Sequence, residues 1–482
     1  MLELDHLLAT WAKTKPYDLA FANENHELTF AELNSYTRKI ATLLAQSGIS
    51  RGDLVCTILP SYPGWVFTLA LHLLGVTTTS KSNPLPFGPE AIPDWCIGLT
   101  SHPQIAANRT IIFDQRYLEK INAAPEMAKV PVFAGPADLA GIFGTSGTSG
   151  DEKYISLTVA EFESMVELPW SPEFPEVENI LSFFSFGMLW PLVDSYKCLT
   201  AGRAFYSFHN YPINPVAQKY PINTLLGAPM QFAGFLDVIE KQGIKLPQLK
   251  RVILAGSVPS QKLLNRITDN LECEIFNMYG STEAGNITMT RIGNEFAKGA
   301  AINPLVDLQI VDDQDRQVAR GEIGNIRYKK LHMANSYYKN AAATAEFFKE
   351  GYFYPGDLGF IDNDGYLNLS GRISEVINLG GIKINPESID AVALTQSGVI
   401  DCAAFAYVTK GGVENLALAL VTGQEFDLEL LKSQFSVTHV PKPAHFVSVG
   451  AIPRNANGKI LRNQLTNEFS AEIGSRQGDL SG

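Results

Sequence analysis

The sequence has few cysteines and histidines, and neither type is clustered. Its five cysteines are an odd number, are widely spaced and form no Cys-x-x-Cys pair, which excludes a disulfide framework and favours a reducing compartment. The eight histidines are equally scattered, and no His-Glu-x-x-His motif occurs. A structural zinc site is therefore not expected.

The chain also lacks a long uninterrupted apolar run. The most apolar long stretch, residues 54–76, is broken by Pro60, Gly64 and His72, so it does not have the composition of a membrane-spanning helix. The N-terminal residues include acids and lack an apolar segment followed by small residues, so no secretory signal peptide is expected. The cytoplasm is the expected location.

Positive charge is in the minority, with 38 Lys and Arg against 50 Asp and Glu and a net charge of −12. No overall attraction to nucleic acid or to an anionic membrane is expected. With 45% hydrophobic residues, a chain of 482 residues can bury more than one core. This excludes a disordered protein, a coiled coil and a small disulfide scaffold, and the length predicts about three domains or fewer.

The pattern up to about residue 280 is typical of an α/β protein. Thr29 and Glu32 form a capping box at the start of a predicted helix that ends near Gly48. A buried strand and an apolar helix follow, and further predicted strands cover residues 110–113, 154–157, 180–184, 224–226 and 252–255. The alternation predicts an open, largely parallel sheet with ligands at the carboxyl ends of its strands.

The pattern changes after about residue 300. Short β-like runs are separated by Asp, Asn and Gly, and Asn363-Asp364-Gly365 is a strong hairpin signal. A compact α+β pattern begins after Arg372 and continues to about residue 470. We expect a domain boundary near residues 372–375.

The most specific local signal is a loop rich in glycine and hydroxyl residues that leaves the predicted strand at 140–143. The loop consists of Gly144, Thr145, Ser146, Gly147, Thr148, Ser149 and Gly150, with Lys153 close behind. Its glycines let the backbone curl so that N–H groups point at anionic oxygens. The spacing is neither a Walker A loop nor a dinucleotide-binding motif. A flexible surface loop is the alternative, but the loop and its lysine favour a polyphosphate site.

A second candidate segment follows the predicted strand at 274–276. It reads Asn277-Met278-Tyr279-Gly280-Ser281-Thr282-Glu283. An aromatic residue can cover a base, and a carboxylate can hold Mg²⁺ against phosphates, because hard cations prefer oxygen ligands. Taken alone, the segment could equally be an ordinary turn at the end of a strand, with no role in binding.

Three further segments complete a set of five motifs: Gly351 to Asp357, Gly365 to Arg372, and Pro453 to Ile460. In this order and spacing the chain resembles the adenylate-forming superfamily, from about Tyr17 to Leu465. That superfamily contains acyl-CoA synthetases, nonribosomal-peptide adenylation domains, stand-alone acyl-AMP ligases and beetle luciferases.

The resemblance implies an α/β fold of two domains joined by a hinge. Residues 1–373 would form a large N-terminal domain of layered β-sheets and helices that binds the acid and ATP. Residues 374–482 would form a small α+β C-terminal domain that acts as a mobile lid. Ser374 falls at the hinge position, and Gly380 and Gly381 fall on the tunnel that admits the thiol.

The resemblance also assigns roles around the nucleotide. The residues implied to contact ATP or AMP are Thr145, Ser146, Gly147, Thr148, Ser149, Gly150, Lys153, Ala255, Gly256, Ser257, Asn277, Tyr279, Gly280, Ser281, Asp357 and Arg372. Catalytic roles are implied for Lys459, Thr282 and Glu283, and Glu283 is also the implied ligand of Mg²⁺. Lys459 would bridge the carboxylate and the α-phosphate.

The implied acyl pocket is unusual in this chain. Its residues are Phe184, Ser185, Gly187 and Met188. Many relatives have His-x-x-Gly here, whereas Phe184 takes the histidine's place, and Phe186 and Trp190 extend an apolar lining for which ordinary core packing is the alternative. No acid occurs between Glu178 and Asp194, which disfavours an α-amino acid substrate. A hydrophobic acid, aryl or medium-chain, is expected.

The implied reaction is the ATP-dependent conversion of such an acid to acyl-AMP with release of pyrophosphate. The acyl group would then pass to the thiol of coenzyme A or of a phosphopantetheinyl carrier protein supplied in trans. The chain is therefore expected to be an acid–thiol ligase that uses ATP and Mg²⁺. One alternative is a stand-alone enzyme that loads an amino or aryl acid onto a carrier protein only. Another is a catalytically idle relative that binds nucleotide or acyl-AMP. No nucleic-acid partner and no membrane span are expected.

Overall fold

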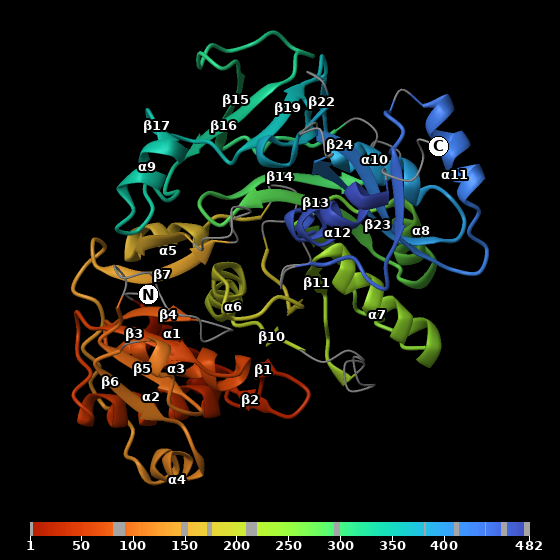
Figure 1. The fold of residues 1–482 in the computed structure, drawn as a ribbon. Coiled ribbons are helices and arrows are strands. Elements are labelled where there is room, and N and C mark those ends of the chain that lie inside the picture. The colour runs from red at the N-terminus through yellow and green to blue at the C-terminus, as the bar shows by residue number, and fades with distance from the viewer. Residues whose placement is uncertain are drawn as a thin grey trace.

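The computed structural model describes most of the chain (Figure 1). The described residues are 3–80, 92–105, 107–145, 153–170, 176–208, 219–293, 299–379, 382–408, 414–438, 440–454 and 460–476.

The first sheet has eight strands and a parallel centre. In spatial order they are β14 (Gly285–Ile292), β13 (Glu274–Ser281), β12 (Arg251–Ala255), β11 (Thr224–Gly227), β9 (Ile180–Ser182), β10 (Phe205–Tyr206), β1 (Leu19–Ala22) and β2 (Glu27–Thr29). Every neighbouring pair from β13 to β1 is parallel, and β14 and β2 close the two edges in antiparallel pairing.

The second sheet has six strands. In spatial order they are β6 (Arg109–Ile112), β5 (Trp95–Gly98), β3 (Leu54–Ile58), β4 (Thr77–Ser80), β7 (Leu139–Thr145) and β8 (Lys153–Thr158). All of its pairs are parallel except β7 with β8. The prediction of largely parallel pairing is confirmed, but the strands divide between two sheets where the alternation predicted one.

The third sheet is antiparallel throughout. It contains β17 (Phe348–Lys349), β18 (Tyr352–Phe353), β16 (Gly324–Lys330), β19 (Asp357–Ile361) and β20 (Leu367–Arg372), with β15 (Val306–Val311) paired to β16. The hairpin expected at residues 363–365 joins β19 to β20. Gly365 there has a φ of 91°, a left-handed conformation that glycine adopts without strain.

The helices of the described residues are α1 (Leu4–Thr14), α2 (Phe30–Gln46), α3 (Ser61–Leu73), α4 (Gln115–Ala123), α5 (Val159–Glu167), α6 (Leu189–Ala201), α7 (Pro229–Gln242), α8 (Gln261–Asn270), α9 (Ala341–Phe347), α10 (Pro386–Leu394), α11 (Leu428–Val437) and α12 (Arg462–Arg476). The capping box predicted at Thr29 is confirmed, because the Glu32 N–H donates to Thr29 Oγ1 and the Thr29 N–H donates to Glu32 Oε2. No helix in this part of the chain combines the length and apolarity that crossing a bilayer requires.

The C-terminal elements form small sheets of their own. The hairpin β21 (Ile377–Leu379) and β22 (Ile382–Ile384) precedes a sheet of β23 (Val399–Val408), β24 (Glu414–Thr422) and β25 (His445–Ser448). These elements are drawn in blue at one side of the molecule in Figure 1, and the first third of the chain, in red and orange, lies at the opposite end.

The apolar cores follow the same division. The largest core joins the first three sheets through side chains such as Phe21, Val55 and Ile326. Two smaller cores contain only residues from Ile377 onward. No core cluster of the described residues combines side chains from before and after residue 373.

Candidate active site

The turn between β13 and β14 places Glu283 in a buried position. β13 continues through Ser281, so the motif at 277–283 lies within a strand and its turn, where the sequence suggested a strand that ends at residue 276. Gly280 permits the close approach of β14, because a Cβ there would lie 2.0 Å from the carbonyl oxygen of Gly285. Ser281 Oγ accepts a hydrogen bond from the Ala284 N–H at 3.2 Å, and Glu283 is only 6% exposed.

A buried tyrosine orients the carboxylate of Glu283. Tyr337 Oη donates to Glu283 Oε1 at 2.7 Å, and the backbone carbonyl of Glu283 accepts from the Ala334 N–H at 2.8 Å. Burial and the neighbouring Glu283 raise the pKa of Tyr337, so its hydroxyl stays a donor at neutral pH. The segment that carries Tyr337 therefore holds the Glu283 turn at two points.

Lys153 lies near the same tyrosine. It begins β8, directly opposite Thr145 at the end of β7. Its Nζ is 4.7 Å from the ring centroid of Phe347 and 6.0 Å from that of Tyr337. The two ends of the glycine-rich loop thus lie next to the residue that contacts Glu283. Ser146, Gly147, Thr148, Ser149 and Gly150 lie outside the described residues.

Asp357 and Arg372 form a second polar group on the third sheet. They are directly opposite on β19 and β20, and Arg372 Nε lies 2.8 Å from Asp357 Oδ1. Tyr279 of β13 donates its hydroxyl to Asp357 Oδ2 at 2.6 Å. Burial and the Asp357 charge raise the pKa of Tyr279, which keeps its hydroxyl protonated.

Strand β13 connects the two polar groups. Tyr279 contacts Asp357, and Glu283 follows four residues later, in the turn after the strand. Tyr328 of β16 donates to Ser281 between them at 3.2 Å. Asp357 thus contacts β13 itself, and Glu283 lies in the turn that follows this strand. The roles assigned to these residues remain predictions.

The residues predicted to surround adenine are also adjacent. Ala255, at the end of β12, is the parallel partner of Met278 on β13, and Gly256 leaves the strand with a φ of 91°. Asn277 Oδ1 is buried and has no hydrogen-bond partner in the part of the chain that the structure describes. Such an acceptor fits the exocyclic amino group of adenine, because a buried acceptor gains a full hydrogen bond from a ligand.

Glu283 is also suited to act as a ligand of a magnesium ion. Mg²⁺ is usually held by one or two carboxylates together with phosphates and water. The described residues contain no group of three His, Cys, Asp or Glu side chains that could hold a metal by themselves. Glu283, with one oxygen bound by Tyr337, could provide a single protein ligand beside bound phosphates.

The predicted acyl-pocket residues divide between two environments. Phe184 packs in an apolar cluster with Leu226, Ile253 and Phe276, and Met188 contacts the same cluster. Phe186 instead lies in the main core, with ring centroids 5.9 Å from Trp65 and 5.2 Å from Phe205. The contacts of Phe186 are those of the core-packing alternative, and its place in the pocket lining stays a prediction. Ser185 and Gly187 form the intervening turn, in which the Gly187 N–H donates to Ser185 Oγ at 3.2 Å.

The hinge and tunnel residues are described only in part. Ser374 lies in a short 3-10 turn, Ile373–Glu375, between β20 and β21. Gly380, Gly381 and Lys459 lie outside the described residues. Thr282 and Ser257 lie in the turns after β13 and β12, next to the residues discussed above.

Sequence reasoning missed Tyr337 and Tyr328. Both are buried tyrosines whose hydroxyls reach β13 or its turn. Neither belongs to a motif, and a buried tyrosine has no signal in the sequence that separates it from core packing.

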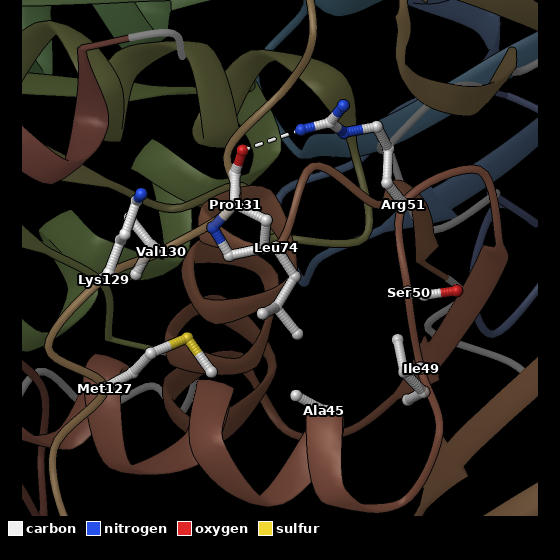
Figure 2. Close-up of a pocket in the computed structure, with 9 residues that line it drawn as sticks. All are labelled: Ala45, Ile49, Ser50, Arg51, Leu74, Met127, Lys129, Val130 and Pro131. Carbon is white, nitrogen blue, oxygen red and sulfur yellow. Dashed lines mark hydrogen bonds between the residues drawn. The ribbon is translucent and has the colours of Figure 1, made fainter.

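A separate surface hollow lies away from this site (Figure 2). It has a volume of about 560 Å³ and lies between the end of α2, the loop after it and the segment 127–131. Arg51 Nη2 donates to the Pro131 carbonyl across it at 2.8 Å. None of the predicted site residues lines it.

Comparison with known proteins places these features in a family. Residues 98–338, which are 241 of the 482 residues, match the family model described as AMP-binding enzyme. The 2-succinylbenzoate–CoA ligase of Geobacillus sp. (strain WCH70) is 26% identical over 472 residues, which cover 93% of this chain and 94% of that protein.

Solved structures show the same fold. The o-succinylbenzoate coenzyme A synthetase (MenE) of Bacillus subtilis, in complex with ATP and a magnesium ion, has a TM-score of 0.82 and 21% identity, with 95% and 98% of the two chains covered. ATP-bound MatB of Rhodopseudomonas palustris has a TM-score of 0.83 and 21% identity, with 98% and 99% covered. The predicted fold class, the superfamily and the ligase class are thereby confirmed, together with ATP, Mg²⁺ and coenzyme A as the family's cofactors. The chain belongs to the family of AMP-binding enzymes, within the adenylate-forming superfamily of acid–thiol ligases.

Proposed function

We propose that this protein activates a hydrophobic carboxylic acid with ATP and passes the acyl group to the thiol of coenzyme A. The observation that carries the proposal is the arrangement along β13. Tyr279 contacts Asp357 there, Glu283 follows in the turn, and Tyr337 links that turn to Lys153.

The nucleotide would lie across the end of β13. Asn277 would accept a hydrogen bond from adenine, and Asp357 would bind the ribose hydroxyls while Arg372 neutralises its charge. Lys153 and the backbone N–H groups of its loop would bind the phosphates. Glu283 would hold Mg²⁺, which would supply positive charge that offsets the negative charge of the phosphate oxygens.

The first half-reaction is a displacement at the α-phosphorus. A carboxylate oxygen of the acid forms a bond to phosphorus, the bond to pyrophosphate breaks, and acyl-AMP remains bound. Two anions must approach each other, so catalysis depends on positioning and electrostatic stabilisation. Thr282 and Lys459 would stabilise the charge on the phosphoryl and carboxylate oxygens.

The second half-reaction transfers the acyl group. The thiol sulfur forms a bond to the acyl carbon, the bond between that carbon and the AMP oxygen breaks, and the thiol proton is released. The names of the relatives favour coenzyme A as the acceptor, because the Geobacillus protein is a CoA ligase. A carrier protein presents the same thiol, so the acceptor assay below includes one.

An apolar acid fits the Phe184 cluster best. Leu226, Ile253 and Phe276 surround Phe184 and offer no charge for a polar substrate. Asp194, the first acid that follows this segment in the chain, is buried and accepts a hydrogen bond from the Trp170 indole at 3.2 Å. It is therefore unsuited to bind an α-ammonium group, which disfavours an α-amino acid.

We also propose that the boundary between two domains, 1–373 and 374–482, acts as a hinge. Arg372, before the boundary, is anchored to Asp357 of the large domain. Glu375, after it, is anchored to Arg462 of α12 at 3.3 Å. Ser374 lies between these two anchors and would permit the small domain to rotate between the half-reactions.

The exchange of labelled pyrophosphate into ATP tests this function. A panel of aryl, fatty and amino acids is added singly to the full chain with ATP and Mg²⁺. Exchange that depends on an aryl or medium-chain acid is expected, and thioester formation with coenzyme A should exceed that with a carrier protein. A protein that binds ATP but supports no exchange with any acid would be the catalytically idle relative instead.

A further inference from the structure

Asn286 on β14 carries a buried acceptor that no donor of the described residues reaches. The side chain is 8% exposed, and no donor among the described residues reaches its Oδ1. Most buried polar atoms in proteins are paired, so a buried acceptor with no partner requires an explanation. Asn286 Oδ1, Asn277 Oδ1 and Thr288 Oγ1 are three such atoms on the strand pair β13–β14.

The orientation of the Asn286 amide is fixed. Its Nδ2 donates to the backbone carbonyl of Trp170 at 2.6 Å. A carbonyl can only accept, so the nitrogen must face Trp170, and the unpaired end is the oxygen. Trp170 is itself held, because its indole N–H donates to the buried Asp194 of α6. The oxygen is thus a preset acceptor rather than one that can turn to find a partner.

Asn286 lies where the reacting groups and the apolar cluster meet. It is three residues beyond Glu283 and directly opposite Gly280 on β13, which has no side chain to cover it. Trp170, its partner, packs against the cluster that contains Phe184 and Met188. The acceptor therefore stands beside the place proposed for the acyl group.

We infer that Asn286 Oδ1 binds a hydrogen-bond donor on the organic acid. The substrate would then be an otherwise apolar acid that carries a hydroxyl, an aryl amine or an amide N–H. A neutral donor fits better than an ammonium group, because burying an unpaired charge costs far more than burying a paired dipole. This inference rests on the proposed function and adds the chemical class of its substrate.

Matched pairs of acids test the inference. Benzoate is compared with its hydroxy and amino derivatives, and hexanoate with its hydroxy derivatives, in the pyrophosphate exchange assay. The preferred acid should exceed its donor-free partner about 5- to 150-fold in kcat/KM, the range expected when one buried acceptor is paired or left unpaired. Wild-type protein whose best acids carry no donor would overturn the inference.

The variant Asn286→Leu separates recognition from structure. Its ratio between the two acids of a pair should fall close to one, while the KM for ATP stays near the wild-type value. Asn179→Leu is the matched control, because Asn179 Nδ2 also donates to a backbone carbonyl, at 2.9 Å, but its Oδ1 already accepts from the Ala204 N–H at 3.0 Å. That variant should keep the wild-type ratio.

The outcomes distinguish a failure of the proposed function from a failure of the role assigned to Asn286. Absence of exchange with every acid contradicts the proposed function itself. Exchange in which Asn286→Leu keeps the full preference for the donor-bearing acid contradicts only the role of Asn286. If Asn286→Leu does not fold, the ratio measured on the wild-type protein decides.

Discussion

At the scale of single residues, the hydroxyl of Tyr337 is the feature that the motifs do not reveal. Because it binds one oxygen of Glu283, it restricts how the carboxylate can turn. Tyr337→Phe should raise the Mg²⁺ concentration needed for half-maximal exchange roughly fivefold, which corresponds to about 1 kcal/mol for one hydrogen bond. Binding of Mn²⁺ to the complex of protein and nucleotide, followed by electron paramagnetic resonance, should weaken by a similar factor.

Tyr328→Phe provides the control for that prediction. Its hydroxyl reaches Ser281 at 3.2 Å rather than the carboxylate, so ion binding should change less. Equal effects of both variants would show that the buried tyrosines act on the turn as a whole.

The residue types of the site could be predicted from the sequence, but not their contacts. Glycines, a lysine and the acids Glu283 and Asp357 stand in motifs whose chemistry can be argued from type and spacing. Phe186 shows the limit, because an aromatic residue near a pocket and one in the core behind it look alike in sequence. The sequence gives no indication of Asn286, since only coordinates show that its oxygen has no partner among the residues that the structure describes.

At the scale of elements, helix α6 buries two opposite charges. Burial raises the pKa of Asp194 to about 7 and lowers that of Lys197 to about 8. Lys197 Nζ donates to the carbonyls of Val166 and Leu168, so it also holds the end of α5.

Removing one of these charges should lower the stability of the folded protein more than removing both. Lys197→Met leaves Asp194 buried without its cation and should destabilise the protein by about 3–5 kcal/mol, whereas the double variant with Asp194→Leu should recover a large part of the loss. Thermal unfolding of the two variants measures the difference. Equal midpoints would show that the two charges are not coupled.

His72 links three elements and makes the stability of the folded protein depend on pH. On α3, its Nδ1 lies 2.5 Å from Tyr196 Oη of α6, and its Nε2 lies 2.9 Å from Thr78 Oγ1 of β4. Burial lowers the pKa of His72 to about 3. Below pH 6.5 the unfolded chain therefore takes up a proton that the folded protein does not, and stability falls as the pH decreases from 6.5 toward 3.

The matched measurement compares wild type with His72→Gln. Relative to the variant, the wild-type protein should lose up to about 1.4 kcal/mol of stability per pH unit between pH 6 and pH 4. Chemical denaturation at several pH values gives this difference. Parallel stability profiles for the two proteins would contradict the assignment of a neutral, buried imidazole.

The elements themselves were mostly predictable, because helix caps and strand periodicity are local. The Thr29 capping box and the hairpin at residue 365 are examples. The division into two parallel sheets was not predictable. β1 pairs with β10, whereas β3 pairs with β4 and β5, and these choices depend on packing between residues that are distant in the sequence.

At the scale of the whole molecule, Arg462 connects several elements that follow residue 373. Its guanidinium binds Asp390 of α10 at 2.6 Å, the Ala404 carbonyl of β23 at 2.6 Å, and Glu375 beside the proposed hinge. Arg462→Ala leaves the buried Asp390 carboxylate with the Ala404 N–H but without a cation, and should lower the free energy of unfolding by about 3–5 kcal/mol.

The loss of stability in Arg462→Ala should be confined to the residues after the proposed boundary at residue 373. Calorimetry of the full-length variant should show a separate transition at lower temperature, and the main transition should keep its midpoint. A single transition shifted as a whole would contradict the division at residue 373.

The central claim is that an organic acid takes AMP from a nucleotide held between the two domains. Lys459, which lies outside the described residues, would supply charge to the reacting oxygens. Removal of a charge that stabilises the reacting oxygens should lower the rate at least about 10²–10³-fold.

The most direct test is therefore the pyrophosphate exchange activity of Lys459→Ala measured beside its thioester formation from supplied acyl-AMP. We predict that exchange falls to the background level while thioester formation from acyl-AMP continues. Full exchange activity in the variant would contradict the account.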